Sequence, residues 1–191
     1  MLADAVDDGR PFAFDEPFLQ LAHSLASPQL DRWMLYASDL GYQYFVVPAD
    51  IALLVVLVAG KHVRKAVFVA AAVLGSITLN LATKAIFARE RPSLWESIAP
   101  EHSYSFPSGH AMGAATLAAV LVLLTWRGRW RWPALLLSSA FAGWVGASRV
   151  YLGVHYPSDI LAGMLAAVAW CTFAYVIVRP HRHTGNLPDA P

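Results

Sequence analysis

Hydrophobic residues dominate five long stretches of the chain, and short polar links separate these stretches. They cover residues 42–60, 66–88, 110–126, 132–147 and 157–178. A helix that crosses a bilayer needs about 20 mostly apolar residues, and these runs approach or reach that length. The third and fourth runs are short, so we expect them to extend into the interface. The pattern predicts an all-α, integral membrane bundle of about five transmembrane helices.

Residues 16–38 follow a different pattern, in which apolar positions recur at helical spacing and polar residues fill the other side. A single spanning helix is disfavoured here because Pro28, Asp31 and Arg32 lie in its centre. We predict two short amphipathic helices in the membrane interface. The expected organisation is an acidic tail with these helices over 1–41, a transmembrane core over 42–178, and a flexible cytoplasmic tail over 179–191.

Charged residues divide unevenly between the links. Basic side chains gather at 61–65, at 127–131 and after residue 178, whereas most acidic side chains belong to the other links and the N-terminus. By the positive-inside rule, the basic links face the cytoplasm, and the loops at 89–109 and 149–156 face outward. We expect a bacterial inner membrane protein whose site opens on the periplasmic face. Residues 1–16 carry several acids and lack the features of a signal peptide.

Composition agrees with a membrane protein, since 57% of the residues are hydrophobic and 14% are charged. The net charge of +1 gives no case for nucleic acid binding. One cysteine, Cys171, lies in an apolar run, so no internal disulfide or zinc-ligand spacing exists. The oligomeric state is left open.

Polar residues gather at one end of the apolar runs. Lys84 and Arg91 are seven residues apart, which places both on one helix face, and Arg149 adds a third cation. Three converging cations suit a phosphate dianion. Ser108 is placed as a helix N-cap, where free backbone N–H groups attract anions, and Gly109 allows a ligand to approach the backbone closely. Together they predict an anion pocket.

Two histidines accompany this pocket. His155 precedes a helix whose first turn holds Asp159, and an Asp–His pair makes the free imidazole nitrogen a better nucleophile or base. His110 is the candidate proton donor. Arg89 and Ser148 lie beside these residues and are candidates for substrate contact.

The spacing of these residues resembles a known signature. It reads Lys84-x6-Arg91-Pro92, then Pro107-Ser108-Gly109-His110, then Ser148-Arg149-x5-His155-x3-Asp159. The chain is similar to the type 2 phosphatidic acid phosphatase superfamily of membrane lipid phosphatases, and every fixed position of that signature is matched in order.

The resemblance implies a mechanism. His155 would attack phosphorus to form a phosphohistidine that water hydrolyses, Asp159 would orient His155, and His110 would protonate the leaving oxygen. The phosphoryl oxygens would be held by Lys84, Arg91, Ser108, Gly109 and Arg149. No metal or other cofactor is expected, because cations of the protein replace it. The substrate would be a lipid phosphate or diphosphate, with undecaprenyl diphosphate, phosphatidate and phosphatidylglycerophosphate left as alternatives.

Other functions remain open at this stage. The same site would suit a lipid phosphotransferase, or a membrane protein that binds a phosphate lipid without catalysis. Haloperoxidases and soluble acid phosphatases share the motif, but they are not built from five apolar spans.

Overall fold

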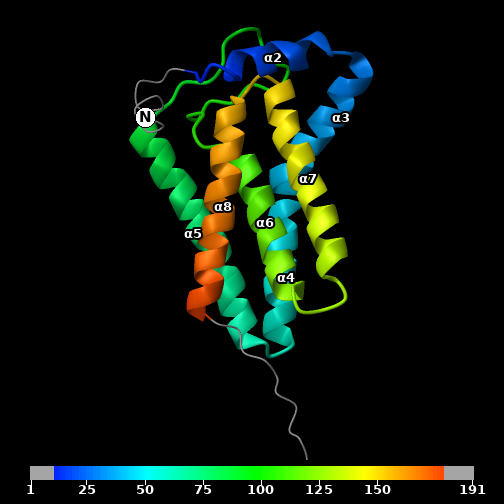
Figure 1. Cartoon of the computed structure of the whole chain (residues 1–191), viewed down its shortest axis with the longest axis vertical. Helices are drawn as coiled ribbons and strands as arrows, with labels where there is room; N and C mark the ends of the chain where they lie inside the picture. Colours follow the sequence, from blue (N-terminus) through cyan, green and yellow to red (C-terminus); the bar gives the residue numbers. More distant parts are fainter. Residues whose placement is uncertain (1–10, 179–191) are drawn as a thin grey trace, which may run out of the picture.

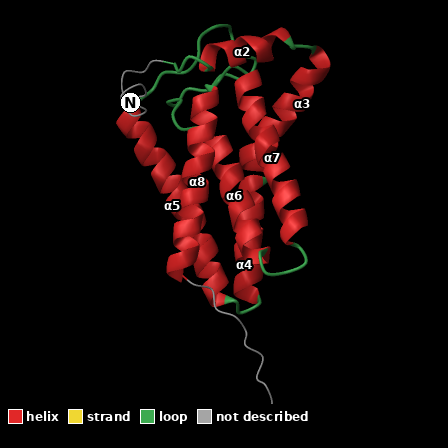
Figure 2. Cartoon of the chain, in the orientation of Figure 1, coloured by secondary structure: helices red, strands yellow, loops and turns green. Residues whose placement is uncertain are grey.

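Five long helices run side by side in the computed structural model, which describes residues 11–178 (Figure 1). Their bounds are α4 Val46–Ala59, α5 Val63–Phe87, α6 Gly109–Thr125, α7 Arg131–Tyr151 and α8 Pro157–Val178. Each matches one of the apolar runs to within a few residues at most boundaries. No strand occurs among the described residues (Figure 2), so the predicted all-α fold is confirmed. The predicted 179–191 tail lies outside the described residues.

The outer surface of the bundle is apolar. Large hydrophobic side chains are exposed along the helices, including Val55, Leu74, Leu81, Leu136, Leu137, Leu165 and Ile177. By length and composition Pro28–Ala59, Val63–Phe87 and Pro157–Val178 can each cross a membrane, and Gly109–Thr125 is a shorter apolar helix. A large exposed apolar surface is unfavourable in water and favourable in hydrocarbon, so this surface faces lipid. The protein is therefore an integral membrane protein.

The N-terminal helices differ in their relation to the bundle. Helix α2, Asp15–Ser24, lies across one end of it, as an interfacial helix should (Figure 1). Helix α3, Pro28–Asp39, instead continues through the π-helical turn η1, Leu40–Tyr44, into α4. The first span therefore has no break at residue 42. Gly41 permits the close packing of this turn, since a Cβ there would lie 2.5 Å from Cγ1 of Val145.

Helix α6 is the central element and packs against α5, α7 and α8. Its buried face is rich in small residues such as Ala111, Ala114 and Ala118. Small side chains let membrane helices approach closely, and dispersion contacts then stabilise the bundle. The first turn of α6 is thereby fixed at the centre of one end of the molecule.

The links sort into two sets. The α4–α5 and α6–α7 connections lie at one end, and the 88–108 loop and the α7–α8 turn lie at the other (Figure 1). Gly153 enables that second turn, because its φ of +70° is a conformation that L side chains rarely adopt. All three motif segments therefore meet at the end opposite the basic links, as the charge pattern predicts.

Candidate active site

The cations of the site converge on one carboxylate, that of Glu101 in the 88–108 loop. Arg91 donates from Nη2 to Oε2 at 2.6 Å, and Arg149 donates from Nη2 to Oε1. The Arg91 guanidinium is further held by the carbonyl oxygens of Ser103 and Val154, at 2.7 and 2.6 Å. Two arginines from different segments thus bind one anion, and guanidinium groups bind the oxygens of carboxylates and of phosphoryl groups alike.

The two histidines lie beside the same carboxylate. Nδ1 of His110 is 3.7 Å from Oε1 of Glu101, and Nε2 of His155 is 3.9 Å from Oε2. Each imidazole therefore addresses a different oxygen of one anion. The Arg91 guanidinium also lies 3.1 Å from Nε2 of His155. A nucleophile and an acid placed around a common anion site suit a displacement at phosphorus.

Behind His155, Asp159 engages the other imidazole nitrogen. Oδ2 of Asp159 is 3.5 Å from Nδ1 of His155 and accepts hydrogen bonds from the Ser105 hydroxyl at 2.5 Å and the Tyr156 N–H at 2.9 Å. The Ser105 oxygen lies 3.3 Å from the same Nδ1. This arrangement turns Nε2 toward the anion, as a nucleophilic imidazole needs.

The start of α6 forms another wall of the site. Ser108 is the N-cap, and its side chain accepts from the Ala111 N–H. Its own N–H donates to the Asp159 carbonyl oxygen at 3.1 Å. Helix α8 approaches this turn closely at Gly163, where a Cβ would lie only 2.9 Å from the Ser108 carbonyl oxygen. The predicted helix N-terminus at Ser108 and Gly109 is therefore packed directly against the helix that carries Asp159.

The third predicted cation, Lys84, reaches the same loop. Its ammonium donates to the Tyr104 carbonyl oxygen and to the Ser103 hydroxyl, the latter at 3.2 Å. Ser103 in turn accepts from Arg91 at 3.0 Å. Lys84 thus lies next to the arginine pair through a shared loop residue. The prediction that Lys84 and Arg91 share one helix face is wrong, because α5 ends at Phe87 with Ala88 in the left-handed conformation and Arg91 belongs to the loop.

The two candidates for substrate contact have other partners in this structure. Arg89 is buried and pairs with Asp15 and Asp159 at 3.1 and 2.6 Å. Ser148 is also buried, and its hydroxyl donates to the carbonyl oxygen of Val145 within its own helix, at 2.7 Å. Substrate contact by these two residues stays a prediction.

Several residues of the site were not singled out from the sequence, namely Asp15, Ser38, Glu101, Ser103 and Ser105. Ser38 accepts a hydrogen bond from Arg149 across 111 residues of sequence, and Asp15 reaches Ser158 across 143. Contacts of that range leave no periodic signal. Ser105 lies two residues before the Pro107-Ser108-Gly109-His110 motif, but its partners His155 and Asp159 are also distant in the sequence.

Burial and charge set the ionisation of the loop groups. Burial, together with the cations Arg91 and Arg149, lowers the pKa of His155 to about 4, although Asp159 opposes this shift. Burial alone would raise the pKa of Glu101, but Arg149 and Arg91 outweigh it and hold that pKa below its ordinary value of 4.5. The free site therefore contains a neutral imidazole and a charged carboxylate at neutral pH.

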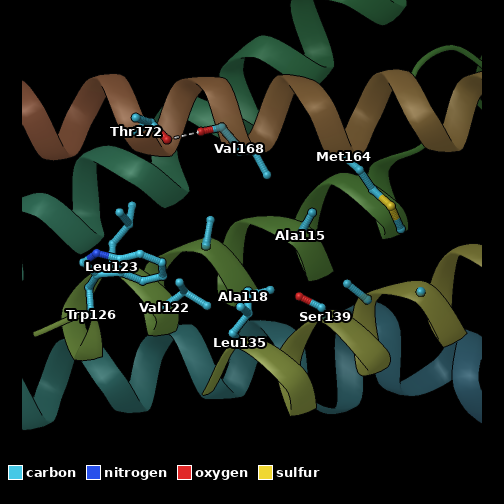
Figure 3. A pocket seen from close by; sticks show the side chains of 13 residues that line it. Ala115, Ala118, Val122, Leu123, Trp126, Leu135, Ser139, Met164, Val168 and Thr172 are labelled. Atoms are coloured by element: carbon cyan, nitrogen blue, oxygen red, sulfur yellow. Dashed lines mark hydrogen bonds between the residues drawn. The ribbon is translucent and has the colours of Figure 1, made fainter. Parts of the chain in front are cut away.

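An apolar groove with a volume of about 450 Å³ runs along α6 between α7 and α8 (Figure 3). Its lining comes from these three helices: Ala115, Ala118, Ala119, Val122, Leu123, Trp126, Leu135, Ser139, Ala142, Gly143, Met164, Val168 and Thr172. The Thr172 hydroxyl is satisfied by the Val168 carbonyl oxygen, at 2.7 Å. Ala115 and Met164 are each five residues from a site residue, His110 and Asp159, so the groove begins about 8 Å along the helices from the site.

The sequence matches the family model described as the PAP2 superfamily over residues 65–182. The chain belongs to this superfamily. It is 33% identical over 160 residues to an undecaprenyl-diphosphatase of Sulfolobus acidocaldarius, covering 77% of this chain and 69% of that protein. It is 30% identical over 172 residues to phosphatidylglycerophosphatase B of Bacillus subtilis, covering 85% and 82%.

Solved PAP2 structures share the fold. The transmembrane PAP2-type phosphatidylglycerolphosphate phosphatase of Bacillus subtilis superposes with a TM-score of 0.72 at 26% identity, covering 90% of this chain and 88% of that one. Aquifex aeolicus LpxE also gives 0.72, at 25% identity, covering 86% and 96%. The protein is thus a PAP2 membrane enzyme of the lipid phosphatase class, and the predicted family and fold are confirmed.

Proposed function

We propose that this PAP2 protein hydrolyses a lipid phosphate or lipid diphosphate through a phosphohistidine on His155, at the outer face of the membrane. One observation carries the proposal: two arginines and two imidazoles surround a single bound carboxylate, that of Glu101. The substrate's phosphoryl group would take the place of that carboxylate. The basic links at the opposite end of the bundle support an outward-facing site.

In the first step, Nε2 of His155 forms a bond to phosphorus while the bond from phosphorus to the leaving oxygen breaks. The electron pair passes to that oxygen, which takes a proton from His110. Arg91, Arg149 and Lys84 neutralise the charge that spreads over the phosphoryl oxygens. The protein's own cations thus supply the electrostatic stabilisation.

In the second step, water attacks the phosphohistidine and the phosphorus–nitrogen bond breaks. His110, now neutral, takes the proton from the water, so that phosphate leaves and both histidines return to their starting forms. Asp159 stabilises the positive charge that appears on the His155 ring during each step. An acceptor lipid in place of water would give the phosphotransferase that the same site allows.

The decisive experiment is phosphate release from purified protein in detergent, with divalent metals chelated. We expect activity in wild type, a loss of at least about 10³-fold in His155→Ala, and a trapped acid-labile phosphoprotein in wild type only. Activity that disappears on chelation, or that survives His155→Ala, would contradict the proposal.

The proposed role of His110 as the acid can be tested with substrates that differ in their leaving group. A lipid alkoxide leaves poorly without a proton, whereas a phosphate leaving group needs less help. His110→Ala should therefore damage monoester hydrolysis far more than diphosphate hydrolysis. Equal losses on the two substrates would remove the acid role from His110.

The apolar groove supports a lipid substrate, and we propose that a hydrocarbon chain of the substrate lies in it. The groove is lined almost entirely by apolar atoms, opens on helices that face lipid, and starts close to the site on the two helices that carry His110 and Asp159. Its volume falls in the range of small-molecule sites. A chain lying there would place its headgroup at the cation pair.

Gly143→Leu tests this use of the groove, because nothing lies within 4 Å of a Cβ at Gly143 and the leucine would fill the open space. We expect KM to rise about 10-fold for a long-chain lipid phosphate and to stay unchanged for a short-chain soluble one. Ala140→Leu, exposed on the same helix but not part of the lining, is the matched control. An unchanged KM for the long-chain substrate would contradict this use of the groove. If a Ser139→Cys variant also formed cross-linked dimers, the groove would instead be a contact with a second copy of the chain.

A further inference from the structure

Arg89 connects the carboxylate of Asp159 to the N-terminal helix α2. Its Nη1 donates to Oδ1 of Asp159 at 2.6 Å and to the Ser158 hydroxyl at 2.9 Å, and its Nη2 donates to Oδ2 of Asp15 at 3.1 Å. The side chains of Arg89, Asp15 and Asp159 are all 0% exposed. A buried series of ion pairs therefore links α2 to Asp159, the carboxylate beside His155.

Asp15, like Asp159, accepts hydrogen bonds at both of its carboxylate oxygens. Its Oδ1 accepts from the Ser158 N–H at 2.9 Å, and its Oδ2 accepts from the Ser158 hydroxyl at 2.7 Å and the Phe12 N–H at 2.9 Å, besides Arg89. A buried ion cluster gives weak net stabilisation, because desolvation offsets the attraction. The hydrogen bonds of the cluster instead fix its geometry.

The two oxygens of Asp159 have separate partners. Oδ1 is taken by Arg89, whereas Oδ2 faces Nδ1 of His155 together with the Ser105 hydroxyl and the Tyr156 N–H. The carboxylate cannot rotate without breaking the Arg89 pair. The guanidinium is itself fixed by the Tyr156 ring, whose centroid lies 4.2 Å from its carbon.

We propose that Arg89 and Asp15 are positioning residues for phosphoryl transfer, which hold Asp159 with one oxygen committed to His155. This inference rests on the proposed function of His155. A carboxylate that orients an imidazole keeps the reactive nitrogen aimed and stabilises the charge that develops on the ring. Arg89 acts on the reaction only through Asp159, and Asp15 acts only through Arg89 and Ser158.

A double-mutant cycle tests the dependence of Arg89 on Asp159. Arg89→Met should lower kcat by about 10-fold to 100-fold, the scale of partners that orient a reactive group, while KM changes less than about 3-fold. In an Asp159→Asn background the same change should cost nothing further, because its target is already lost. Losses that multiply in the double variant, or a rise in KM as the main effect of Arg89→Met, would overturn the proposal.

Asp15→Asn is the gentler variant, because it keeps the shape of the side chain. We expect it to lower kcat about 10-fold, with no loss in Glu16→Gln, the exposed neighbour on the same helix. Arg89→Lys should retain more activity than Arg89→Met. Wild-type kcat in Asp15→Asn would refute the role of α2, whereas activity surviving His155→Ala would refute the phosphohistidine mechanism itself.

Discussion

Two carboxylate clusters lie on opposite sides of the His155 ring, and they differ in access to solvent. At Nε2, Glu101 pairs with Arg91 and Arg149, and its side chain is 26% exposed. At Nδ1, Asp159 pairs with Arg89, and both are completely sealed. Both clusters pair a carboxylate with arginine, and they differ in burial.

The difference teaches which ion pairs a substrate can replace. In the front cluster, Glu101 and Arg91 belong to a loop and Glu101 is partly exposed, so under the proposed function a substrate anion would replace its carboxylate. The rear pair at Asp159 would leave uncompensated buried charges if either partner left, at a cost of several kcal/mol. The front cluster therefore suits ligand binding, and the rear cluster suits alignment.

Asp159→Asn breaks the rear cluster at its centre. We expect kcat to fall about 10³-fold or more, as when other His-orienting aspartates are changed to asparagine, with the fold intact by circular dichroism. The measurement is steady-state phosphate release. A loss of less than about 5-fold would mean that the sealed side contributes little to the reaction.

Gly163→Val disturbs the wall that joins the rear cluster to the α6 N-terminus. The added side chain would clash with the Ser108 carbonyl oxygen, and overpacking should lower stability by about 1–3 kcal/mol, measured as denaturation in detergent. Gly143→Val is the control with the same helix propensity, because space is open at Gly143. Equal stability of the two variants would show that α8 does not depend on this close approach.

Glu101→Gln removes charge from the front cluster alone. We expect inhibition by orthophosphate or vanadate to strengthen about 5-fold to 10-fold, because the arginines no longer hold an internal anion. Glu90→Gln, an exposed acid of the same loop, should leave inhibition unchanged. Weaker inhibition in Glu101→Gln would mean that this carboxylate assists ligand binding instead of competing with it.

The pH profile sharpens the comparison with the smallest change. The pKa of His155 lies at about 4 instead of 6.5. The imidazole therefore stays neutral as the pH falls through 6.5, and it becomes protonated only as the pH falls through about 4. The enzyme-derived acid limb of kcat/KM should therefore lie near pH 4. Profiles measured with two substrates of different phosphate pKa distinguish the titration of the enzyme from the titration of the substrate, because only the latter shifts between them. A common limb near 6.5 would contradict the lowered pKa.

Much of the fold was predictable because lipid imposes a strong pattern on the sequence. Each span is a long apolar run, and the break expected at Pro28 separates α2 from α3, which begins at that residue. The continuity of α3 with α4 was not predictable, because it depends on how Gly41 packs against Val145 in another helix. Local composition reports burial in lipid, whereas it does not report helix-to-helix fit.

The site, like the fold, contains residues that the sequence predicts and residues that it does not. The structure brings together the site residues that the motif predicts, namely His110, His155, Asp159, Arg91 and Arg149. His110, Arg149 and Asp159 lie in end turns of helices, whereas Arg91 and His155 lie in the connections next to them. Glu101 and Asp15 were not predictable as site residues, because an acid in a link or near the N-terminus is usually a solvated surface group. Their roles arise from loop and helix placement over long sequence distances, which no single-sequence pattern records.

The bridge between Asp15 and Ser158 joins the first described helix of the chain to the last. During synthesis, α2 emerges first and must wait for α8 before its carboxylate finds a partner. Non-local contacts form late in folding, because the intervening chain has to be ordered first. A nascent chain would therefore lack the Asp15–Ser158 bridge until α8 had been synthesised, and the carboxylate of Asp15 would lack this partner until then.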